Sequence, residues 1–293
     1  MTLGTAQLGM RYGIANGSGQ PSKMEASSIL ASAHRHGFSH LDTAAAYGES
    51  ESVIGALLPH IDPGASLKVV SKIPFGLPIE NWSAQLERSL QKLGRSHLDG
   101  WLLHNDSDFP RLDKVALDLV SEHMSKGKVR AFGVSCYSPE VALAALEMPQ
   151  VSLLQVPANV FDRRFLSQKL LVLLQSRKCF LFVRSAFLQG LCLLPPNAVP
   201  ARVPGGRQAV ATLVNFCRQH DLSPQAFCLH YLADRLKTVP HSIIVGVEKT
   251  EQLDELAAFA VQPSPPEEVF AAWEEIFPQG NIHLVNPQLW PHA

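Results

Sequence analysis

Short apolar runs rich in β-branched residues alternate with stretches of helical periodicity along almost the whole chain. Eight such runs, each four to six residues long, suit strands that are buried on both faces of a sheet. We expect these strands at residues 2–5, 39–42, 68–72, 99–104, 130–135, 152–156, 179–184 and 242–246. Regular alternation of this kind is typical of βα units on a parallel sheet. Eight units predict an α/β protein with a (β/α)₈ fold, the TIM barrel.

The stretches between the expected strands carry helix signals of their own. Ser22 followed by Glu25 has the spacing of a capping box, in which two side chains satisfy backbone groups at a helix start. Ser138 before Pro139 places a capping residue ahead of a proline at the first helical position. We therefore expect a layer of helices around the sheet.

Two stretches interrupt this rhythm. Residues 188–206 form a long connection with several prolines and a Gly205-Gly206 pair, and such a loop is either a lid or a solvated tether. Residues 264–293 contain a short amphipathic helix and a tail that we expect to pack on the barrel. The pattern has no domain boundary, so we expect one domain over residues 1–293.

Composition narrows the class of protein. The length of 293 residues would allow two domains, but barrels of this kind run to about 250 residues as one unit. With 46% hydrophobic and 17% charged residues the chain can build a large core, which excludes disorder. The 25 basic and 26 acidic residues nearly balance, so nothing favours nucleic acid or an anionic membrane as partner. Small neutral or weakly charged substrates fit better.

The five cysteines form no close pair, which argues against a zinc site or a disulfide framework and for a reducing compartment. The first 20 residues do not resemble a signal peptide, and no window reaches the roughly 18 apolar residues of a membrane helix. We expect a cytoplasmic protein. His34, His36 and His40 lie near one another, but surface and packing roles explain them, so no metal is expected.

Polar residues close three consecutive strands. Asp42 ends the second expected strand, Lys72 the third and His104 the fourth, and Tyr47 follows Asp42 by five residues. Singly, each has an ordinary explanation as a turn cap, a solvent-facing amine or a structural histidine. In a (β/α)₈ barrel, however, the carboxyl ends of neighbouring strands lie side by side. The four side chains are therefore candidates for one catalytic site.

The residue types indicate proton transfer to a carbonyl oxygen. A phenol with a pKa of about 10 is a poor acid at neutral pH unless a nearby cation stabilises its phenolate. Lys72 can be that cation, Asp42 can hold Lys72, and His104 can orient the carbonyl against Tyr47. A hydride must come from a nicotinamide or flavin cofactor, because no side chain supplies one.

The phosphate groups of such a cofactor need a binding site. The chain has no GxGxxG after a strand and no GxxxxGK[ST], so neither a Rossmann module nor a P-loop is expected. After the eighth expected strand, Gly246 opens a turn that leads into residues 247–253, where we expect a helix to begin. The amino end of a helix can hold an anion, and this is the usual phosphate seat of the fold.

In order and spacing, several segments resemble the aldo/keto reductase superfamily over nearly the whole chain. The segments are residues 41–48 (LDTAAAYG), 71–72, 102–104, 127–135, 155–159 and 189–191. The resemblance implies a (β/α)₈ barrel, a monomer by default, that binds NADP(H) and reduces aldehydes or ketones. It also implies that Tyr47 donates the proton.

The resemblance assigns residues one by one. Asp42, Tyr47, Lys72 and His104 match the catalytic tetrad of the family. Asn159 either joins the seat of the nicotinamide carboxamide or only braces its loop. The residues that match cofactor-binding positions are Gly4, Thr5, Ser135, Gln155, Arg184, Leu188, Gly190, Gly246, Glu248, Lys249 and Gln252.

Three positions depart from the family pattern. Arg184 stands where many relatives stack an aromatic ring on the nicotinamide, and we expect it to touch the cofactor. Glu248 stands near the expected 2′-phosphate of NADP, which a carboxylate repels, although Lys249 can compensate. A carboxylate there is also how a site prefers NAD, so NAD(H) stays an alternative to NADP(H). Leu256 stands where many relatives have an asparagine that contacts the adenine.

Residues 3–16 and 183–190 also resemble a bacterial branch of the superfamily associated with surface-polysaccharide synthesis. A sugar-like carbonyl compound is therefore a possible substrate. Candidate pocket residues in the variable loops are Tyr12, Phe75 and Asn105.

Two other functions compete with the reductase. A barrel that binds NADP(H) but serves as a regulatory or interaction subunit would show tight cofactor binding with little turnover. A lyase or isomerase that uses Asp42 and His104 alone leaves Tyr47 and Lys72 without a role. The complete tetrad favours the reductase.

Overall fold

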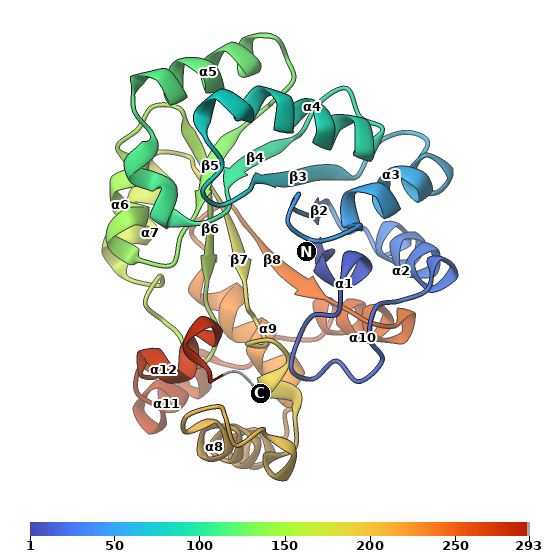
Figure 1. Ribbon diagram of the computed structural model, residues 1–293. Helices are drawn as coiled ribbons and strands as arrows, with labels where there is room; N and C mark the ends of the chain where they lie inside the picture. The colour runs from blue at the N-terminus through green and yellow to red at the C-terminus, as the bar shows by residue number, and fades with distance from the viewer. Residues whose placement is uncertain (292–293) are drawn as a thin grey trace.

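The computed structural model describes residues 1–291 and contains a closed barrel of eight parallel strands in chain order (Figure 1). The strands are β1 (Thr2–Gly4), β2 (His40–Asp42), β3 (Lys68–Ile73), β4 (Gly100–Leu103), β5 (Phe132–Ser135), β6 (Val151–Pro157), β7 (Phe180–Arg184) and β8 (His241–Gly246). The predicted (β/α)₈ fold is confirmed, and the strand bounds differ from the expected ones by at most two residues.

Strand register brings distant strand ends together. In β1, Gly4 pairs with Asp42 of β2 on one side and with Gly246 of β8 on the other. A candidate catalytic carboxylate and the expected phosphate turn therefore flank one short strand. Thr5 and His104 directly follow β1 and β4, so they too lie at the carboxyl end of the barrel.

Helices form the outer layer. They are α1 (Ala6–Gly9), α2 (Lys23–Arg35), α3 (Ser50–Ile61), α4 (Trp82–Leu93), α5 (Lys114–Ser125), α6 (Pro139–Leu146), α7 (Gln168–Ser176), α8 (Gly206–Gln219), α9 (Pro224–Arg235), α10 (Thr250–Ala260), α11 (Glu267–Ile276) and α12 (Ile282–Val285). Five short 3₁₀ segments join them at Ile79–Asn81, Asp106–Arg111, Leu191–Leu193, Pro196–Ala198 and Pro287–Leu289. At the start of α2 the capping box of Ser22 and Glu25 is confirmed.

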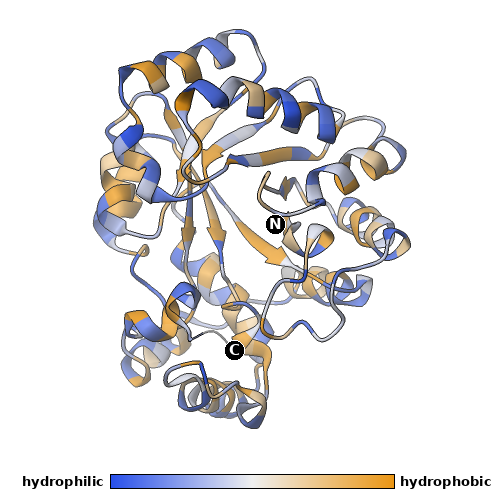
Figure 2. Ribbon diagram, viewed as in Figure 1, coloured by the Kyte–Doolittle hydropathy of each residue, from blue (hydrophilic) through white to orange (hydrophobic). Residues whose placement is uncertain are grey.

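The barrel is filled from within. Its interior holds a cluster of buried apolar side chains from β3, β4, β6, β7 and β8, namely Val70, Leu102, Leu153, Phe182 and Ile244. A larger buried cluster lies between strands and helices, and the strands accordingly stand out as hydrophobic in Figure 2. Because side chains pack the interior, only the ends of the barrel can hold a ligand.

The long connection after β7 is folded onto the barrel. Leu188, Leu191, Val199 and Val203 are buried, and two of the 3₁₀ segments lie in this stretch. A fully solvated tether does not describe it, because such a tether would not bury four apolar side chains. Packing of this kind restricts the loop, and its first residues border the cavity described below.

The C-terminal segment lies across the loop that follows β6. Phe270 and Trp273 of α11 are buried, and the Trp273 indole N–H donates a 3.0 Å hydrogen bond to the Val160 carbonyl. In residues 1–291 no helix combines the length and apolar character needed to cross a membrane. The five cysteines, all within this part of the chain, are free and buried.

Candidate active site

A buried ion pair joins β2 to β3. Lys72 Nζ donates hydrogen bonds of 2.8 Å to Asp42 Oδ1 and 2.8 Å to the Thr43 carbonyl. The same ammonium lies 3.4 Å from Tyr47 Oη, and its distance to the centre of the Tyr47 ring is 4.8 Å. Three of the four expected catalytic side chains therefore meet around one ammonium group.

A close packing contact fixes the turn that carries Tyr47. Helix α1 passes so near this turn that a Cβ atom on Gly9 would lie 1.9 Å from the Tyr47 carbonyl oxygen. Three residues after Tyr47, Ser50 Oγ donates a 2.9 Å hydrogen bond to the Thr5 carbonyl. Only glycine fits at position 9, because any side chain would push the Tyr47 turn away.

His104 faces Tyr47 edge to face. The two ring centres are 5.5 Å apart and the ring planes cross at 84°. Burial lowers the pKa of His104 to about 3, and the charges of Lys72 and Arg184 add to this effect. His104 is therefore a neutral imidazole at physiological pH, with one nitrogen free to donate a hydrogen bond.

Gln155 braces the carboxylate from the far side of the barrel. Its Nε2 donates a 2.7 Å hydrogen bond to Asp42 Oδ1, across 113 residues of sequence. In the sheet register Gln155 lies opposite Ser135, and both side chains are buried. Gln155 thus touches the tetrad directly, and its amide oxygen is not used in this bond.

Opposing effects act on the pKa values of the central pair. Burial raises the pKa of Tyr47 and the Asp42 charge raises it further, while the Arg184 charge lowers it. Burial lowers the pKa of Lys72, and Asp42 works against that shift through its charge and hydrogen bond. A cation held by a carboxylate next to a desolvated phenol is an arrangement that can deliver a proton.

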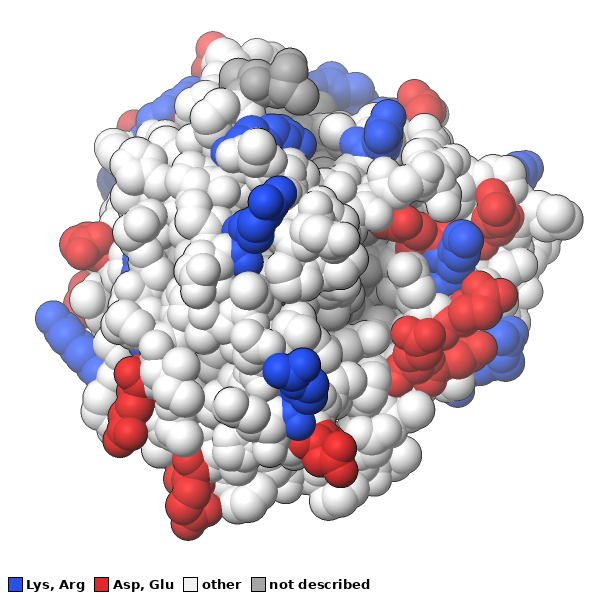
Figure 3. All heavy atoms as spheres, turned by 90° about the horizontal axis from the view of Figure 1, so that it is seen from below, with Lys and Arg blue, Asp and Glu red and all other residues white. Residues whose placement is uncertain are grey.

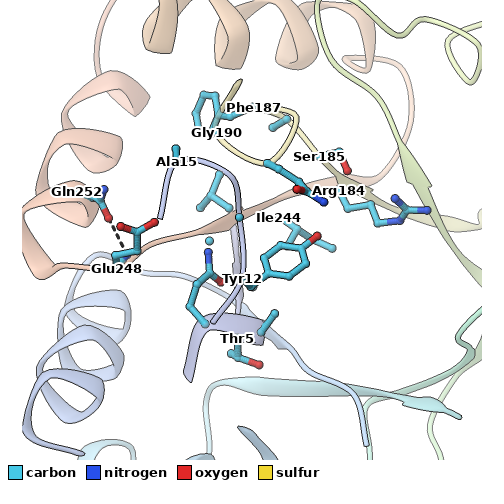
Figure 4. Close-up of a pocket in the computed structure, with 18 of the residues that line it drawn as sticks. Thr5, Tyr12, Ala15, Arg184, Ser185, Phe187, Gly190, Ile244, Glu248 and Gln252 are labelled. Carbon is cyan, nitrogen blue, oxygen red and sulfur yellow. Dashed lines mark hydrogen bonds between the residues drawn. The ribbon is translucent and has the colours of Figure 1, made fainter. Parts of the chain in front are cut away.

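A cavity of about 380 Å³ opens beside this group. Asp42 and Tyr47 border it, together with residues from the ends of β1, β7 and β8. The expected ligand-binding residues that line it are Gly4, Thr5, Tyr12, Arg184, Gly190, Gly246, Glu248 and Gln252. In Figure 4, Glu248 and Gln252 lie at one end and Arg184 at the other, with Tyr12 and Ile244 between them.

The side of the molecule where β6, β7 and β8 end is shown in Figure 3. Uncharged residues cover most of this side, and acidic side chains gather at one edge. This side of the molecule therefore has no single strong charge (Figure 3).

Other expected site residues lie outside the cavity lining. Phe75 is 62% exposed, and Leu188 is completely buried in the core. The Asn105 side chain accepts a 2.8 Å hydrogen bond from the Ser107 N–H and so caps a 3₁₀ segment. Ser135 and Lys249 also do not line the cavity.

Asn159 is a bracing residue. Its Nδ2 donates to the Ser185 carbonyl at 3.1 Å, and its Oδ1 accepts from the Phe161 and Asp162 amides at 2.9 and 3.1 Å. These bonds use the side chain to join the loops after β6 and β7. Of the two roles considered for Asn159, the geometry matches the loop brace.

The start of α10 is capped by its own chain. Gln252 Oε1 accepts hydrogen bonds from the Glu248 N–H at 2.7 Å and the Lys249 N–H at 3.2 Å. Burial raises the pKa of the Glu248 carboxyl, while Lys249 lowers it. The carboxylate borders the cavity and the neighbouring ammonium does not, although the sequence places them side by side.

Sequence reasoning missed several residues of the site. Gln7, Ala15 and Phe187 line the cavity, and Tyr137 supports Arg184 with its ring. Tyr137 follows Ser135 by two residues, so an aromatic residue just after a strand end was an available signal. Gln7 lies in α1, a single helical turn for which the apolar pattern gives no sign. No cluster of metal-ligating residues occurs in the part of the chain that the structure describes.

Comparison with known proteins gives a consistent result. The model of the aldo/keto reductase family matches residues 1–277. The NADH-specific methylglyoxal reductase of Escherichia coli (strain K12) is 26% identical over 270 residues, which cover 82% of this chain and 80% of the relative.

Two solved structures have a similar fold. The holo form of an aldo-keto reductase from Bacillus halodurans superposes with a TM-score of 0.77 at 17% identity, covering 97% of this chain and 94% of that one. A glycerol dehydrogenase from Gluconobacter oxydans gives a TM-score of 0.74 at 21% identity, covering 98% of this chain and 92% of that one. At these identities the likeness concerns the fold.

Proposed function

This chain belongs to the aldo/keto reductase family of NAD(P)H-dependent oxidoreductases, and on that premise we propose that it reduces an aldehyde or ketone with Tyr47 as proton donor. The observation that carries the proposal is the position of Lys72 Nζ, 2.8 Å from Asp42 Oδ1 and 3.4 Å from Tyr47 Oη. Tyr47 also borders the cavity in which a substrate can lie.

The proposed roles follow from charge and geometry. As Tyr47 gives up its proton, negative charge develops on the phenol oxygen, and the Lys72 ammonium stabilises that charge. Asp42 holds the ammonium in place and keeps it protonated against the effect of burial. Gln155 in turn orients Asp42 through its 2.7 Å hydrogen bond.

His104 positions the substrate in this proposal. Its pKa of about 3 keeps the ring neutral, so it orients a carbonyl oxygen by a hydrogen bond and does not compete with Tyr47 as acid. Because the two rings are in edge-to-face contact, the proposal has one carbonyl oxygen accept hydrogen bonds from both the Tyr47 hydroxyl and a His104 ring N–H.

The cavity suits a dinucleotide. Gly246 and Gln7 both line the cavity. A Cβ atom at position 246 would lie 2.4 Å from the Gln7 side-chain amide, so a side chain there would push Gln7 out of place. Among residues 1–291 the buried Arg184 Nε atom has no hydrogen-bond partner, as expected of a donor that awaits a ligand. When bound, NAD(P)H supplies the hydride. The residues proposed to hold it are Gly4, Thr5, Ser135, Gln155, Arg184, Leu188, Gly190, Gly246, Glu248, Lys249 and Gln252, where Leu188 can contribute only backbone atoms.

NADPH is the proposed cofactor, because the resemblance to the family implies it and Lys249 can attract a 2′-phosphate. One observation supports NADH as the second candidate. The Glu248 carboxylate borders the cavity whereas Lys249 does not, and a carboxylate there accepts hydrogen bonds from a 2′-hydroxyl and repels a phosphate.

A sugar-like carbonyl compound is the proposed substrate, on the resemblance to a branch associated with polysaccharides. Tyr12 borders the cavity and supplies both an apolar ring and a hydroxyl, which suits a polyol. Phe75 and Asn105, which do not line the cavity, are proposed as secondary substrate contacts.

Turnover of purified protein tests the proposal. NADPH or NADH is incubated with a panel of aromatic aldehydes and sugar-derived carbonyl compounds, and the loss of cofactor absorbance is followed. Reduction of at least one compound with formation of the matching alcohol is expected. Cofactor binding without turnover on any compound would instead favour a regulatory subunit, and the absence of binding would overturn the cofactor assignment.

A further inference from the structure

Arg184 at the end of β7 has an unusual environment for a partly buried arginine. Its guanidinium lies over the Tyr137 ring, 4.1 Å from the ring centre. One long hydrogen bond of 3.4 Å runs from Nη2 to the Cys136 carbonyl, and the described part of the chain offers no partner to the buried Nε. Most of the hydrogen-bonding capacity of this side chain is therefore unused.

No carboxylate neutralises Arg184 within residues 1–291. Arg164 shows the contrast, because its Nε and Nη2 hold both oxygens of Asp162 at 2.8 and 2.7 Å. Asp42, the acid in the catalytic group, is already bonded to Lys72 and Gln155. A partly desolvated cation without a counter-charge is unfavourable, and an anionic ligand relieves that cost.

Hydrogen bonds to the backbone around Tyr137 hold the ring on which Arg184 stacks. The Tyr137 N–H donates a 2.6 Å hydrogen bond to Asp106 Oδ2, and the Ser138 N–H donates to the same oxygen at 2.8 Å. Arg164 Nη1 holds the Tyr137 carbonyl at 3.3 Å. A stacked guanidinium on a fixed ring is oriented before a ligand arrives, which favours specific binding.

The guanidinium lies close to the reacting centre. Arg184 borders the same cavity as Tyr47 and Tyr12, and its charge is felt by both Tyr47 and His104. An anion bound to Arg184 therefore lies near the carbonyl group that Tyr47 protonates. Glu248 lies at the opposite end of the cavity, so the two charges do not neutralise each other (Figure 4).

We propose that Arg184 binds a carboxylate or phosphate group of the carbonyl substrate, so that the preferred substrates are acidic aldehydes or ketones. This inference rests on the proposed reductase function and adds a charge requirement to its substrate. The planar guanidinium suits a carboxylate because two parallel hydrogen bonds can form. The diphosphate of the cofactor offers the same chemistry and is the other source of an anion.

A matched pair of substrates tests the proposal. 4-Formylbenzoate and its methyl ester have similar reactivity and shape but differ in charge. We expect the wild-type enzyme to favour the carboxylate by roughly 10- to 100-fold in kcat/KM, the usual value of a charge-assisted hydrogen bond. Arg184→Met should abolish this ratio mainly through KM, and Arg184→Lys should restore part of it. In the control Arg11→Met, which removes an exposed arginine near Tyr12 that does not line the cavity, the ratio should persist.

Other outcomes separate the possibilities. Equal use of both compounds by the wild type would overturn the inference and leave the reductase intact. A rise in the Kd of NADPH in Arg184→Met, with an unchanged substrate ratio, would leave Arg184 with its proposed cofactor contact alone and would also overturn the inference of a substrate-anion site.

A binding measurement keeps the two proposals distinguishable if neither compound is reduced, a result that would speak against the reductase. Calorimetry then compares benzoate with benzamide. Binding of benzoate that is absent for benzamide and lost in Arg184→Met would support the anion site, and equal binding in both proteins would overturn it.

Discussion

Lys72 Nζ and Asp42 Oδ1 lie 2.8 Å apart in a place where the two side chains are only 1% and 6% exposed. Such a pair is expensive to bury and strongly destabilising to break, because removal of one partner leaves an isolated charge. An apolar pair would stabilise the fold as well, and Asp42 borders the cavity, which supports the proposal that the ion pair serves the chemistry.

This interpretation is tested by comparing the stability and the activity of variants that lack one or both partners of the ion pair. Lys72→Met should lose about 3–5 kcal/mol of unfolding free energy, because Asp42 is left without its cation. The double variant Asp42→Leu/Lys72→Met should be more stable than Lys72→Met but equally inactive. Urea unfolding and NADPH oxidation measure the two effects. A double variant less stable than the single one would contradict the account of the pair.

Cofactor preference depends on Glu248 in a second prediction. Glu248→Gln removes a negative charge from the cavity wall and should raise kcat/KM for NADPH relative to NADH by about tenfold, which corresponds to ~1.4 kcal/mol. Glu251→Gln removes an exposed charge in the first turn of α10 that does not line the cavity, and it serves as the control. An unchanged ratio in Glu248→Gln would show that the carboxylate lies away from the 2′ position.

The packing of α1 against the Tyr47 turn yields a third prediction. Gly9→Ala should destabilise the protein by about 1–3 kcal/mol and reduce activity, because its Cβ would collide with backbone that is 1.9 Å away. Gly17→Ala is the control, since no atom lies within 4 Å of the added carbon. Thermal unfolding and turnover report the two effects. Wild-type behaviour of Gly9→Ala would mean that the turn can move freely.

A fourth prediction concerns pH. The pKa of His104 is about 3 in the folded protein, below the ordinary value of 6.5, so the unfolded chain binds more protons between these values. The contribution of His104 to the free energy of unfolding should therefore be fully present above about pH 6.5 and be lost as the pH falls toward 3. His40, with a pKa of about 4, adds to the loss.

His104→Gln tests the contribution of that ring. Urea midpoints at pH 7 and pH 5 should differ less in this variant than in the wild type. The exposed His60→Gln serves as the control and should keep the wild-type difference. An equal pH dependence in His104→Gln would contradict the buried neutral imidazole.

Much of the architecture was predictable because burial constrains sequence strongly. Each barrel strand needs an apolar run, so all eight appear in the pattern within two residues of their bounds. The proximity of Asp42, Lys72 and His104 follows from strand order alone, since parallel neighbours end at one edge.

What escaped prediction depends on side-chain contacts between segments that are distant in the sequence. The bond from Gln155 of β6 to Asp42 of β2 spans 113 residues, and the contact of Arg184 with Tyr137 joins the end of β7 to the loop after β5. The loop after β7 also places Ser185 and Gln189 in the left-handed region, with φ of 63° and 56°. A serine or a glutamine in the sequence does not predict that conformation, because glycine is the residue that adopts it without strain.

The central claim is that Tyr47 donates the proton, and the rate of carbonyl reduction by Tyr47→Phe tests it most directly. Tyr231→Phe, which removes the hydroxyl of a tyrosine bonded to Glu274 on the outer layer, is the matched control. We predict that Tyr47→Phe lowers kcat by about 10²- to 10⁴-fold with an unchanged Kd for the cofactor, and that the control keeps its rate. A Tyr47→Phe enzyme within twofold of the wild-type kcat would contradict the account.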